Sequence, residues 1–470
     1  MRGARAAAML GTLALALALV LSCGDRGDDH TGVSAPDAPS RSPNVVLVLL
    51  DTFRADRVGR IHLGTSMTPR LDALAAESVV FDRAFSHAPW TLPSVASIFT
   101  SRAPGDHGAG GRLGSFTMLG PEAVTLAETL AAAGHRTHAI TNVHFMGPRF
   151  GTMQGFESVD FVAPKDNRLQ RIAEVTTVSA IDWIDRHSMS PATADRPFFL
   201  VVHYFDAHLT YDPPAPWRAR FAAPEDAAPG AHVFGRVSEM VAFRRGERVL
   251  DDATIDRLAK LYDGEVAYLD EHVGALVDGL AERGRLEDTL LVVTSDHGEE
   301  LGDHGGFEHG HTLYDELLHV PLMVRPPGGA RPPHRVDGAV RLVDLAPTIL
   351  DVSGVGVPAA FVGESLAPQL AGEAAPDRPV VSTGNMWGEA GRALHWDGFK
   401  LIEHPGGGVP QLFDLSADPG EQRDLAGAQP DRVASMRARL SGLDGTAGGA
   451  ASPELSDAER EQLRALGYGQ

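Results

Sequence analysis

Two aspartates each follow an apolar run, a position from which a carboxylate could bind a cation. Asp51 follows six apolar residues, and Asp296 closes residues 290–295 and is followed by His297 and Gly298. A carboxylate at the end of a buried strand needs a compensating partner, which a cation provides. A carboxylate beside an imidazole suits a pair of metal ligands, and Gly298 lets the backbone turn sharply. Taken alone, Asp51 is better explained by a turn or a helix cap.

A threonine stands two residues before a proline at a predicted helix start. Thr91 and Pro93 lie in the stretch from His87 to Ser97. A hydroxyl that a metal coordinates has a lowered pKa, and the backbone dipoles of a helix start stabilise nearby negative charge. Threonine is also a suitable N-cap residue. Two interpretations of Thr91 therefore stay open, an activated oxygen nucleophile and a helix cap.

The elements that must position these residues follow an α/β pattern. Continuous apolar, β-rich runs are typical of strands covered on both faces. Such runs occupy residues 45–50, 137–141, 198–205, 290–294 and 320–324. Apolar residues at three- and four-residue spacing predict a helix over residues 255–283, with Gly284 as its stop signal. We therefore predict a doubly wound, mostly parallel sheet flanked by helices, with the functional site beyond the carboxyl ends of the strands.

Two later segments differ from this pattern. Residues 211–248 are rich in Pro, Ala and Arg and lack a clear period, so they form either an insertion near the mouth of the site or a surface loop. We place the catalytic domain at residues 44–375 and a small C-terminal antiparallel α+β subdomain at residues 376–470. The strands and helices predicted for this subdomain lie at residues 398–403, 411–415, 430–443 and 456–466.

The N-terminus has the pattern of a secretory signal peptide. Two arginines precede an apolar run over residues 6–21, which is short for a membrane span of about 20 apolar residues. The run ends in Val-Leu-Ser-Cys, which resembles the lipobox of bacterial lipoproteins, so we expect residues 1–23 to be a signal peptide and Cys23 to carry the lipid. An ordinary signal peptide with an incidental cysteine is the alternative. Residues 24–43 predict a flexible linker. We expect export to the bacterial cell envelope, with the lipid as the only membrane anchor.

Charge and cysteine content narrow the possible partners and chemistry. The chain of 470 residues has 41 basic and 62 acidic residues, which gives a net charge of −21. Such an acidic surface repels phosphate backbones, so we expect no nucleic-acid partner and attribute the charge to solubility. Cys23 is the single cysteine of the sequence, so neither an intrachain disulfide nor a thiol-derived nucleophile is expected.

Several stretches of the chain resemble the sulfatases of the alkaline-phosphatase-like superfamily. Asp-Thr-Phe-Arg-Ala-Asp at residues 51–56 is similar to the opening sulfatase motif. Thr-Leu-Pro-Ser-Val at residues 91–95 stands at the place of the family's nucleophile signature. Further stretches with this resemblance lie at residues 263–270, 296–316, 320–322 and 413–421. Together the matches span about residues 44 to 425, which implies the fold and the ester chemistry of that family.

The resemblance implies a metal site. It assigns Asp51, Asp296 and His297 as ligands, with Thr91 completing the site. In many sulfatases the opening motif has two adjacent Asp residues and the late motif reads Asp-Asn, an oxygen-rich site that suits calcium. Here Thr52 replaces the second Asp and His297 replaces the Asn. We therefore expect a divalent metal, with zinc or manganese favoured over calcium.

The resemblance also makes Thr91 the expected nucleophile. Sulfatases oxidise a Cys or Ser at this position to formylglycine, an aldehyde that threonine cannot give because its Cβ carries a methyl group. No formylglycine is therefore expected. A phosphorylated threonine is the covalent intermediate of phosphoryl-transferring relatives, such as nucleotide phosphodiesterases and lipid-headgroup phosphotransferases, whereas a sulfated threonine would need a second nucleophilic attack to turn over. Val95 stands where sulfatases carry an Arg, a second departure from the sulfatase pattern.

Three residues are assigned to binding of the substrate anion by the same resemblance. Asn142 and His144 stand where sulfatases place a Lys and a His. Arg54 belongs to the opening motif and is the third. The loss of the family's Lys at Asn142 departs again from the sulfate-binding pattern.

Three later histidines complete the expected site. His208 resembles a family histidine that contacts the anion or the leaving group. His309 and His311 occupy the region of a second family Lys, where a histidine could be the general acid for the leaving oxygen. We assign His208 and His309 to catalysis and His311 to substrate binding. Alternatively, Asp206 and His208 could form a second metal site with His309 or His311.

Taken together, these features predict an exported, metal-dependent hydrolase of sulfuric, phosphoric or phosphonic esters on a small molecule, glycan or lipid. The family resemblance favours sulfuric esters, whereas the threonine nucleophile favours phosphate or phosphonate esters. One alternative is a phosphotransferase that moves a lipid headgroup or phosphoester, although such relatives usually carry several membrane helices. Another is a non-catalytic protein that binds anionic glycans, which the missing Arg and Lys suggest.

Overall fold

A computed structural model describes residues 42–164, 170–228, 231–376, 378–404, 406–443 and 455–465 of the chain. The predicted signal peptide, its lipobox cysteine and residues 24–41 of the predicted linker lie outside these ranges. Among the residues described, no helix combines the length and the apolar composition that crossing a membrane requires.

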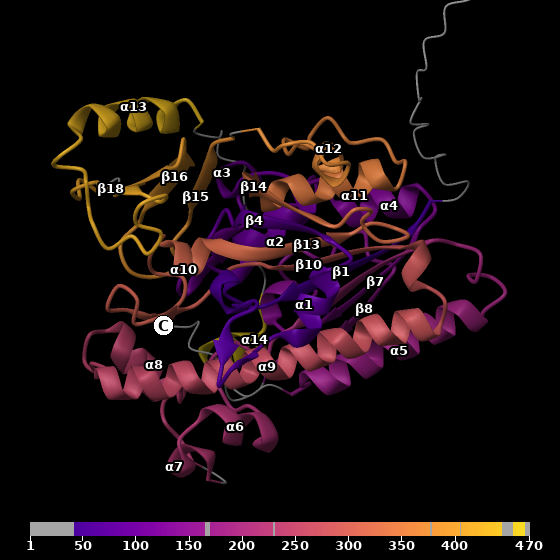
Figure 1. The fold of residues 1–470 in the computed structure, drawn as a ribbon, viewed down its shortest axis with the longest axis horizontal. Coiled ribbons are helices and arrows are strands. Elements are labelled where there is room, and N and C mark those ends of the chain that lie inside the picture. The colour runs from indigo at the N-terminus through magenta and orange to yellow at the C-terminus, as the bar shows by residue number, and fades with distance from the viewer. Residues whose placement is uncertain are drawn as a thin grey trace, which may run out of the picture. The chain divides into compact units, whose positions relative to one another are not determined.

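An eight-stranded sheet forms the centre of the fold (Figure 1). Its strands are β1 (Asn44–Leu50), β4 (Val79–Phe85), β7 (Arg136–Thr141), β8 (Ser158–Phe161), β9 (Phe198–Tyr204), β10 (Thr289–Ser295), β13 (His319–Arg325) and β14 (His334–Arg341). They lie in the order β14-β4-β13-β10-β1-β9-β7-β8. Strand β13 is antiparallel to both of its neighbours, and the other pairs are parallel. The prediction of a mostly parallel sheet is confirmed.

Helices cover both faces of this sheet. Helices α1 (Pro69–Ala75), α5 (Ala173–Met189) and α9 (Asp252–Glu282) lie on one face, and α2 (Thr91–Thr100), α4 (Leu126–Ala132) and α11 (Leu345–Val352) lie on the other (Figure 1). Successive side chains of a strand point to opposite faces. Accordingly Val45, Leu47 and Leu49 join the hydrophobic cluster under α2, and Val46, Val48 and Leu50 join the cluster under α9. The apolar run before Asp51 is therefore apolar throughout because both faces of β1 are buried.

Three strands of the central sheet and the three helices of residues 211–248 were not expected from the sequence. Strands β4, β8 and β14 interrupt their apolar residues with charged ones, which removes the continuous apolar signal. Residues 211–248 contain α6 (Ala215–Phe221), α7 (Pro224–Ala227) and α8 (Val237–Arg244). Helix α9 begins a few residues earlier than predicted, because the Asp251 side chain accepts a hydrogen bond from the Thr254 backbone and caps it.

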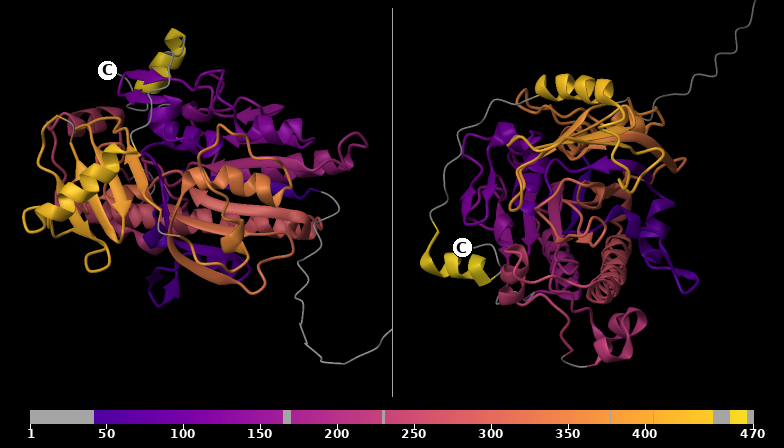
Figure 2. Two further views of the ribbon diagram at one scale, coloured as in Figure 1. Left: turned by 90° about the horizontal axis from the view of Figure 1, so that it is seen from above. Right: turned by 90° about the vertical axis from the view of Figure 1, so that its left-hand side faces the viewer.

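The C-terminal part contains the predicted antiparallel sheet. Its strands are β15 (Val380–Thr383), β16 (Arg392–Trp396), β17 (Phe399–Glu403) and β18 (Gln411–Asp414), and helix α13 (Pro430–Ser441) covers one face (Figure 2). Leu394, Leu401 and Leu412 pack there against Met436 of α13. Helix α14 (Asp457–Ala465) instead places Leu463 in the cluster under α2. The boundary between residues 375 and 376 stays a prediction.

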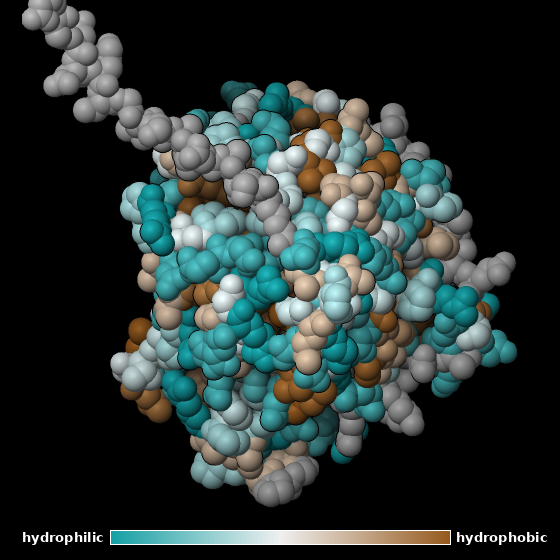
Figure 3. All heavy atoms as spheres, turned by 90° about the vertical axis from the view of Figure 1, so that its right-hand side faces the viewer, coloured by the Kyte–Doolittle hydropathy of each residue, from teal (hydrophilic) through white to brown (hydrophobic). Residues whose placement is uncertain are grey.

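The remaining elements are short. They are η1 (Ala55–Arg57), β2 (Ile61–His62), β3 (Thr65–Ser66), α3 (Pro104–His107), β5 (Gly110–Arg112), β6 (Ser115–Thr117), η2 (His144–Met146), η3 (Leu286–Asp288), β11 (Glu300–Leu301), β12 (Phe307–Glu308), α10 (Asp315–Leu318), η4 (Leu342–Asp344) and α12 (Ala367–Leu370). On the face shown in Figure 3, hydrophilic residues surround small groups of hydrophobic ones, which is the surface that the charge content predicts.

Candidate active site

The two aspartates singled out in the sequence leave neighbouring strands side by side. Strands β1 and β10 are parallel, and their last residues, Leu50 and Ser295, are partners in the register. Asp51 and Asp296 follow directly, so their carboxylates start from the same edge of the sheet. The Ser295 hydroxyl joins the two turns, because it contacts the Leu50 carbonyl and accepts a hydrogen bond from the Phe53 amide at 3.1 Å.

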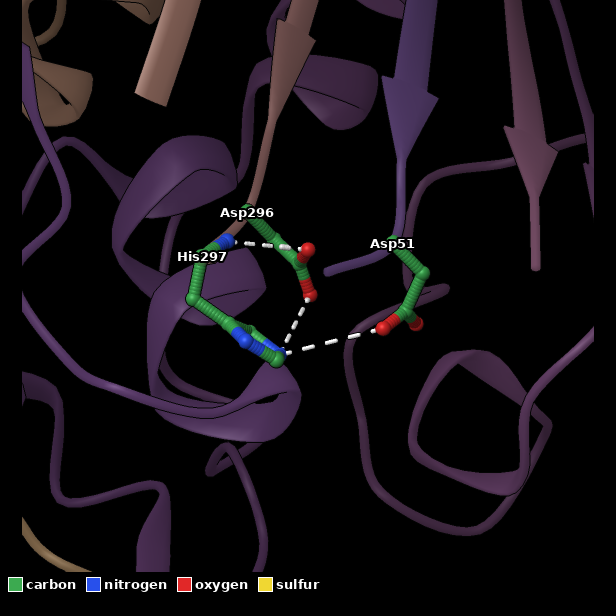
Figure 4. Close-up of side chains that lie close together, drawn as sticks. All are labelled: Asp51, Asp296 and His297. Atoms are coloured by element: carbon green, nitrogen blue, oxygen red, sulfur yellow. Dashed lines mark hydrogen bonds and ion pairs between the residues drawn. The ribbon is translucent and has the colours of Figure 1, made fainter. Parts of the chain in front are cut away.

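These carboxylates and one imidazole form a cluster that could hold a metal ion. One ligand atom from each of Asp51, Asp296 and His297 lies within 4.8 Å of the other two, and the three side chains point toward one another (Figure 4). Nε2 of His297 is 3.4 Å from Oδ2 of Asp296 and 3.8 Å from Oδ1 of Asp51. All three residues are fully buried.

The hydrogen bonds around the cluster leave one inner oxygen of each carboxylate without a donor. Nδ1 of His297 lies 2.9 Å from the Gly298 carbonyl, so this nitrogen carries the ring proton and Nε2 presents a lone pair. Oδ1 of Asp51 and Oδ2 of Asp296 have no hydrogen-bond partner in the described part of the chain. Two carboxylate oxygens and an imidazole lone pair that face one another in a buried site need a cation or a proton between them. The residues present therefore fit a divalent metal.

Electrostatics agree with this fit. Burial, reinforced by the neighbouring Asp51 carboxylate, raises the pKa of Asp296 to about 6. Burial acts in the same direction on Asp51, but a hydrogen bond from His203 and the imidazoles of His208 and His297 hold the pKa of Asp51 below its usual value. Two carboxylates this close disfavour a doubly ionised state. A divalent cation would remove that cost by balancing both charges.

Thr91 directs its hydroxyl at the same cluster. It is the first residue of α2, and the N-cap is Trp90, whose side chain makes no capping hydrogen bond. The helix-cap interpretation of Thr91 is therefore wrong. Its Oγ1 lies 3.3 Å from Nε2 of His297 in a site where the threonine is 1% exposed. Ser94, one turn later, donates a 2.7 Å hydrogen bond to the Asp296 carbonyl and fixes α2 against β10.

Two of the predicted histidines lie beside this cluster. The ring centroid of His309 is 4.6 Å from that of His297 and 5.0 Å from that of His208. Burial lowers the pKa of His309 well below its usual value, and the nearby imidazoles act in the same direction. Burial also lowers the pKa of His208, although the Asp51 carboxylate opposes it. Both rings therefore favour the neutral form.

Glu299 was not expected from the sequence and orients His309. Its Oε1 lies 2.8 Å from Nδ1 of His309, and its Oε2 accepts a 2.8 Å hydrogen bond from the Tyr211 hydroxyl. A proton on Nδ1 directed at this carboxylate leaves Nε2 as the reactive nitrogen of the ring. The signal in the sequence was its position, two residues after His297 in a segment that already carried metal ligands.

The insertion also reaches this region. Arg244, the last residue of α8, forms a buried ion pair with Glu308, the residue before His309. Its guanidinium carbon lies 5.6 Å from the ring centroid of Trp387. Residues 211–248 therefore border the site, as one of the two interpretations of this segment predicted.

Two residues assigned to the substrate already bind within the protein. The Arg54 guanidinium donates to both carboxylate oxygens of Asp303, at 2.6 and 2.9 Å, and to those of Asp56. The Asn142 amide oxygen accepts a 2.8 Å hydrogen bond from Arg171, and its nitrogen donates to the His203 carbonyl. An anion would have to displace these partners to bind either residue.

The other two residues assigned to the substrate are His311 and His144. His311 places Nε2 2.9 Å from Glu300 and stacks on Trp387 at 4.4 Å. His144 lies in η2, where burial lowers its pKa to about 4. Neither position tests their predicted role, which stays a prediction.

Asp206 has a structural partner rather than a metal-site neighbour. Its Oδ1 accepts a 2.8 Å hydrogen bond from the Ala173 amide at the start of α5. Burial raises the pKa of Asp206 to about 7. Within the described ranges, Asp206, His208 and His309 or His311 do not form a second group whose ligand atoms all lie within 4.8 Å of one another.

Comparisons with known proteins agree with the fold. The sulfatase family model matches residues 43–355, and the model of the C-terminal region of N-sulphoglucosamine sulphohydrolase matches residues 302–443. An arylsulfatase of Clostridium perfringens is 23% identical over 443 residues, which cover 82% of this chain and 91% of that protein.

Solved structures share the fold of this chain. A phosphonate monoester hydrolase from Silicibacter pomeroyi superposes with a TM-score of 0.66 at 26% identity, covering 88% of this chain and 100% of that one. A protein solved in complex with its substrate D-glucosamine-2-N,6-O-disulfate superposes with a TM-score of 0.68 at 19% identity, covering 87% of this chain and 100% of that one. The shared fold includes the C-terminal region, because both superpositions cover most of the chain.

Proposed function

Because the chain belongs to the sulfatase family and is an ester hydrolase, we propose that it cleaves its ester with Thr91 as nucleophile. The observation that carries this proposal is the 3.3 Å distance between the Thr91 hydroxyl and Nε2 of His297, where two carboxylates also converge. The methyl group on Cβ prevents threonine from becoming formylglycine. The hydroxyl itself must therefore do the chemistry.

The same proposal assigns a divalent metal to Asp51, Asp296, His297 and Thr91. Two carboxylates, an imidazole and a hydroxyl form a donor set that suits zinc or manganese better than calcium. When bound, such a cation would lower the pKa of the hydroxyl and stabilise the anionic oxygens of the ester. The two carboxylates would hold it at the strand ends, and the Gly298 carbonyl accepts a hydrogen bond from Nδ1–H of His297, which leaves Nε2 of that ring free to ligate.

The reaction then has two displacements. The Thr91 oxygen forms a bond to the phosphorus or sulfur atom of the ester, and the bond from that atom to the leaving oxygen breaks, with its electron pair passing to that oxygen. The Thr91 hydroxyl releases its proton to solvent, and His309 takes up a proton from solvent and donates it to the leaving oxygen. Water then attacks the same atom, the bond to the Thr91 oxygen breaks, and one proton of the water returns to the threonine. The products are an alcohol and the free oxyanion.

We propose phosphate or phosphonate esters as the preferred substrates. A phosphorylated threonine hydrolyses by a second attack at phosphorus, whereas a sulfated threonine lacks the collapse to an aldehyde that expels sulfate from formylglycine. Val95 and Asn142 each stand where the sulfatase pattern has a cationic residue, and the loss of both also supports phosphate or phosphonate esters. The phosphonate monoester hydrolase neighbour adds support. The family itself supports sulfuric esters, and the neighbour solved with a disulfated glucosamine supports a glycan as the alcohol part.

A substrate panel tests this proposal. Purified protein loaded with zinc or manganese would be offered aryl sulfate, phosphate monoester, phosphate diester and phosphonate monoester under the same conditions. We expect the highest kcat/KM on a phosphate or phosphonate ester, and mass spectrometry of the Thr91 peptide during turnover should show a phosphate or phosphonate adduct. Turnover of aryl sulfate alone would contradict the preference. A rate that depends on an added alcohol acceptor would indicate a phosphotransferase.

We also propose that the mature protein is an exported lipoprotein anchored through Cys23. The apolar run of residues 6–21 and the Val-Leu-Ser-Cys stretch support this. Expression in a bacterial host with a labelled fatty acid should label the wild type and not Cys23→Ser. Labelling of both proteins, or of neither, would contradict the anchor.

A further inference from the structure

His203 is a buried histidine in the middle of the central sheet that contacts a proposed metal ligand. It lies one residue before the end of β9, the strand that pairs with β1 on the side opposite β10. Its Nε2 is 3.0 Å from Oδ2 of Asp51, and both side chains are fully buried. We infer that His203 is a positioning residue that fixes which oxygen of Asp51 faces the metal. This inference rests on the proposed metal site.

The second nitrogen of the ring determines the direction of this hydrogen bond. Nδ1 of His203 lies 3.3 Å from the backbone amide nitrogen of Asn142, which is a donor. A nitrogen that accepts an N–H carries no proton in a neutral imidazole, so the proton of this ring is on Nε2. His203 therefore donates to Oδ2 of Asp51.

The two oxygens of the Asp51 carboxylate therefore have different roles. Oδ2 is occupied by the His203 N–H, whereas Oδ1 has no hydrogen-bond partner in the described structure and lies 3.8 Å from Nε2 of His297. Only Oδ1 is thus presented to the cation, and the carboxylate cannot turn to present both oxygens without losing the hydrogen bond. Hydrogen-bonded carboxylate ligands are a common way in which proteins orient a metal site.

His203 is itself held by Asn142, the residue that follows the neighbouring strand β7. The side-chain nitrogen of Asn142 donates to the His203 carbonyl, and Arg171 donates to the Asn142 oxygen. Asn142 therefore contacts His203 twice, once through its backbone amide and once through its side chain. Asn142 is therefore placed to support His203 rather than to contact the ester directly.

Metal titration of the full chain tests this inference. Metal-free wild type, His203→Leu, His203→Gln and Asp51→Asn would be titrated with Zn²⁺ against a chromogenic chelator, and with Co²⁺ while its visible spectrum is recorded. His203→Leu removes the donor, and glutamine can place an amide N–H near the position of Nε2. His138→Leu is the matched control, because His138 is a buried strand histidine that stacks on Trp183 and hydrogen-bonds Ser158.

We expect His203→Leu to weaken Zn²⁺ binding about 10–100-fold and to change the Co²⁺ spectrum, as loss of an outer hydrogen-bond partner does at other metal sites. His203→Gln should recover most of the affinity, and His138→Leu should bind like the wild type. A folded His203→Leu protein with wild-type affinity and spectrum would overturn the inference and leave the metal site standing. If the wild type binds no metal, or if Asp51→Asn binds it with the same affinity as the wild type, the proposed metal site itself would be overturned.

A measurement on the wild type covers the case in which His203→Leu does not fold. In protein labelled with ¹⁵N-histidine, the ring nitrogens of His203 should show the Nε2–H form, with assignment by comparison with His203→Gln. The Nδ1–H form would overturn the inference, because such a ring cannot donate to Asp51.

Discussion

Leu50 and Ser295 are register partners at the ends of two neighbouring parallel strands. Each is followed by an aspartate, and the two carboxylates therefore meet at one edge of the sheet without any help from a long loop. Because Asp51 and Asp296 are fully buried and each has an oxygen without a hydrogen-bond partner in the described residues, the pair is stable only with a cation or a proton between them.

Substitution of Asp296 by Asn tests the cation. The amide keeps the size of the side chain but removes one of the two negative charges that we assign to metal binding. We expect the affinity for Zn²⁺ to fall by more than the roughly 10–100-fold that loss of an outer partner costs, and ester hydrolysis to fall with it. Metal content after gel filtration and kcat/KM on the best panel substrate measure both effects. Full metal content with normal activity would contradict the assignment.

The Thr91 hydroxyl is tested by two substitutions. Thr91→Ala removes the proposed nucleophile, and by analogy with other enzymes whose nucleophile is removed we expect kcat to fall by at least about 10³-fold. Thr91→Ser keeps the hydroxyl, and the retained oxygen should preserve most of the activity. Substrate turnover and the mass of the Thr91 peptide during turnover are the measurements. An alanine variant that hydrolyses the ester as fast as the serine variant would exclude this oxygen as the nucleophile.

The sequence predicts the ends of the strands better than the contacts between them. Asp51 and Asp296 could be found because each terminates a run that is apolar on both faces, and such runs mark buried strands. Thr91 could be placed near them only through the family resemblance, since its position depends on how α2 packs on the sheet. The hydrogen bond of Ser94 to the Asp296 carbonyl, which fixes that packing, joins residues about 200 positions apart.

The roles of individual polar side chains were harder to predict. Arg54 stands in a recognisable motif, but its ion pair with Asp303 comes from a distant segment that local sequence does not reveal. His203 lies in the strand predicted over residues 198–205 and was assigned no role, although a histidine in an otherwise apolar strand is a signal for a buried hydrogen bond. Strands β4 and β14 were missed because charged residues interrupt them.

The pair of Glu299 and His309 predicts how the leaving group affects the rate. Nδ1 of His309 faces the Glu299 carboxylate at 2.8 Å, so the other ring nitrogen is the one that can carry a proton to the leaving oxygen. We expect His309→Ala to slow hydrolysis of an alkyl ester about 10²–10⁴-fold. The same substitution should slow hydrolysis of an aryl ester with a nitrophenolate leaving group much less, because the nitrophenolate oxygen leaves without a proton.

Equal losses for the alkyl and the nitrophenyl ester would contradict the role of His309 in protonating the leaving oxygen. His311→Ala is the matched control, because His311 is bound to Glu300 and stacked on Trp387. If His311 only binds the substrate, its loss should act alike on both leaving groups and mainly on KM.

His304 predicts how stability depends on pH. Its Nδ1 lies 2.8 Å from the Glu316 carboxylate and its Nε2 lies 3.1 Å from the Glu421 carbonyl, so a charged ring can donate a hydrogen bond to each. Burial opposes this charge, but Glu316 and Glu421 raise the pKa of His304 from 6.5 to about 9.

A histidine whose pKa is higher in the folded state stabilises the fold fully below its unfolded pKa, and this contribution is lost as the pH rises through the folded value. The stability that His304 contributes should therefore be complete below about pH 6.5 and absent above about pH 9. The Tm of the wild type should exceed that of His304→Gln clearly at about pH 6 and by little at about pH 10. A difference in Tm that stays constant over this range would show that the variant acts through packing on Tyr314 and not through the charge, since that ring stacks on His304 at any pH.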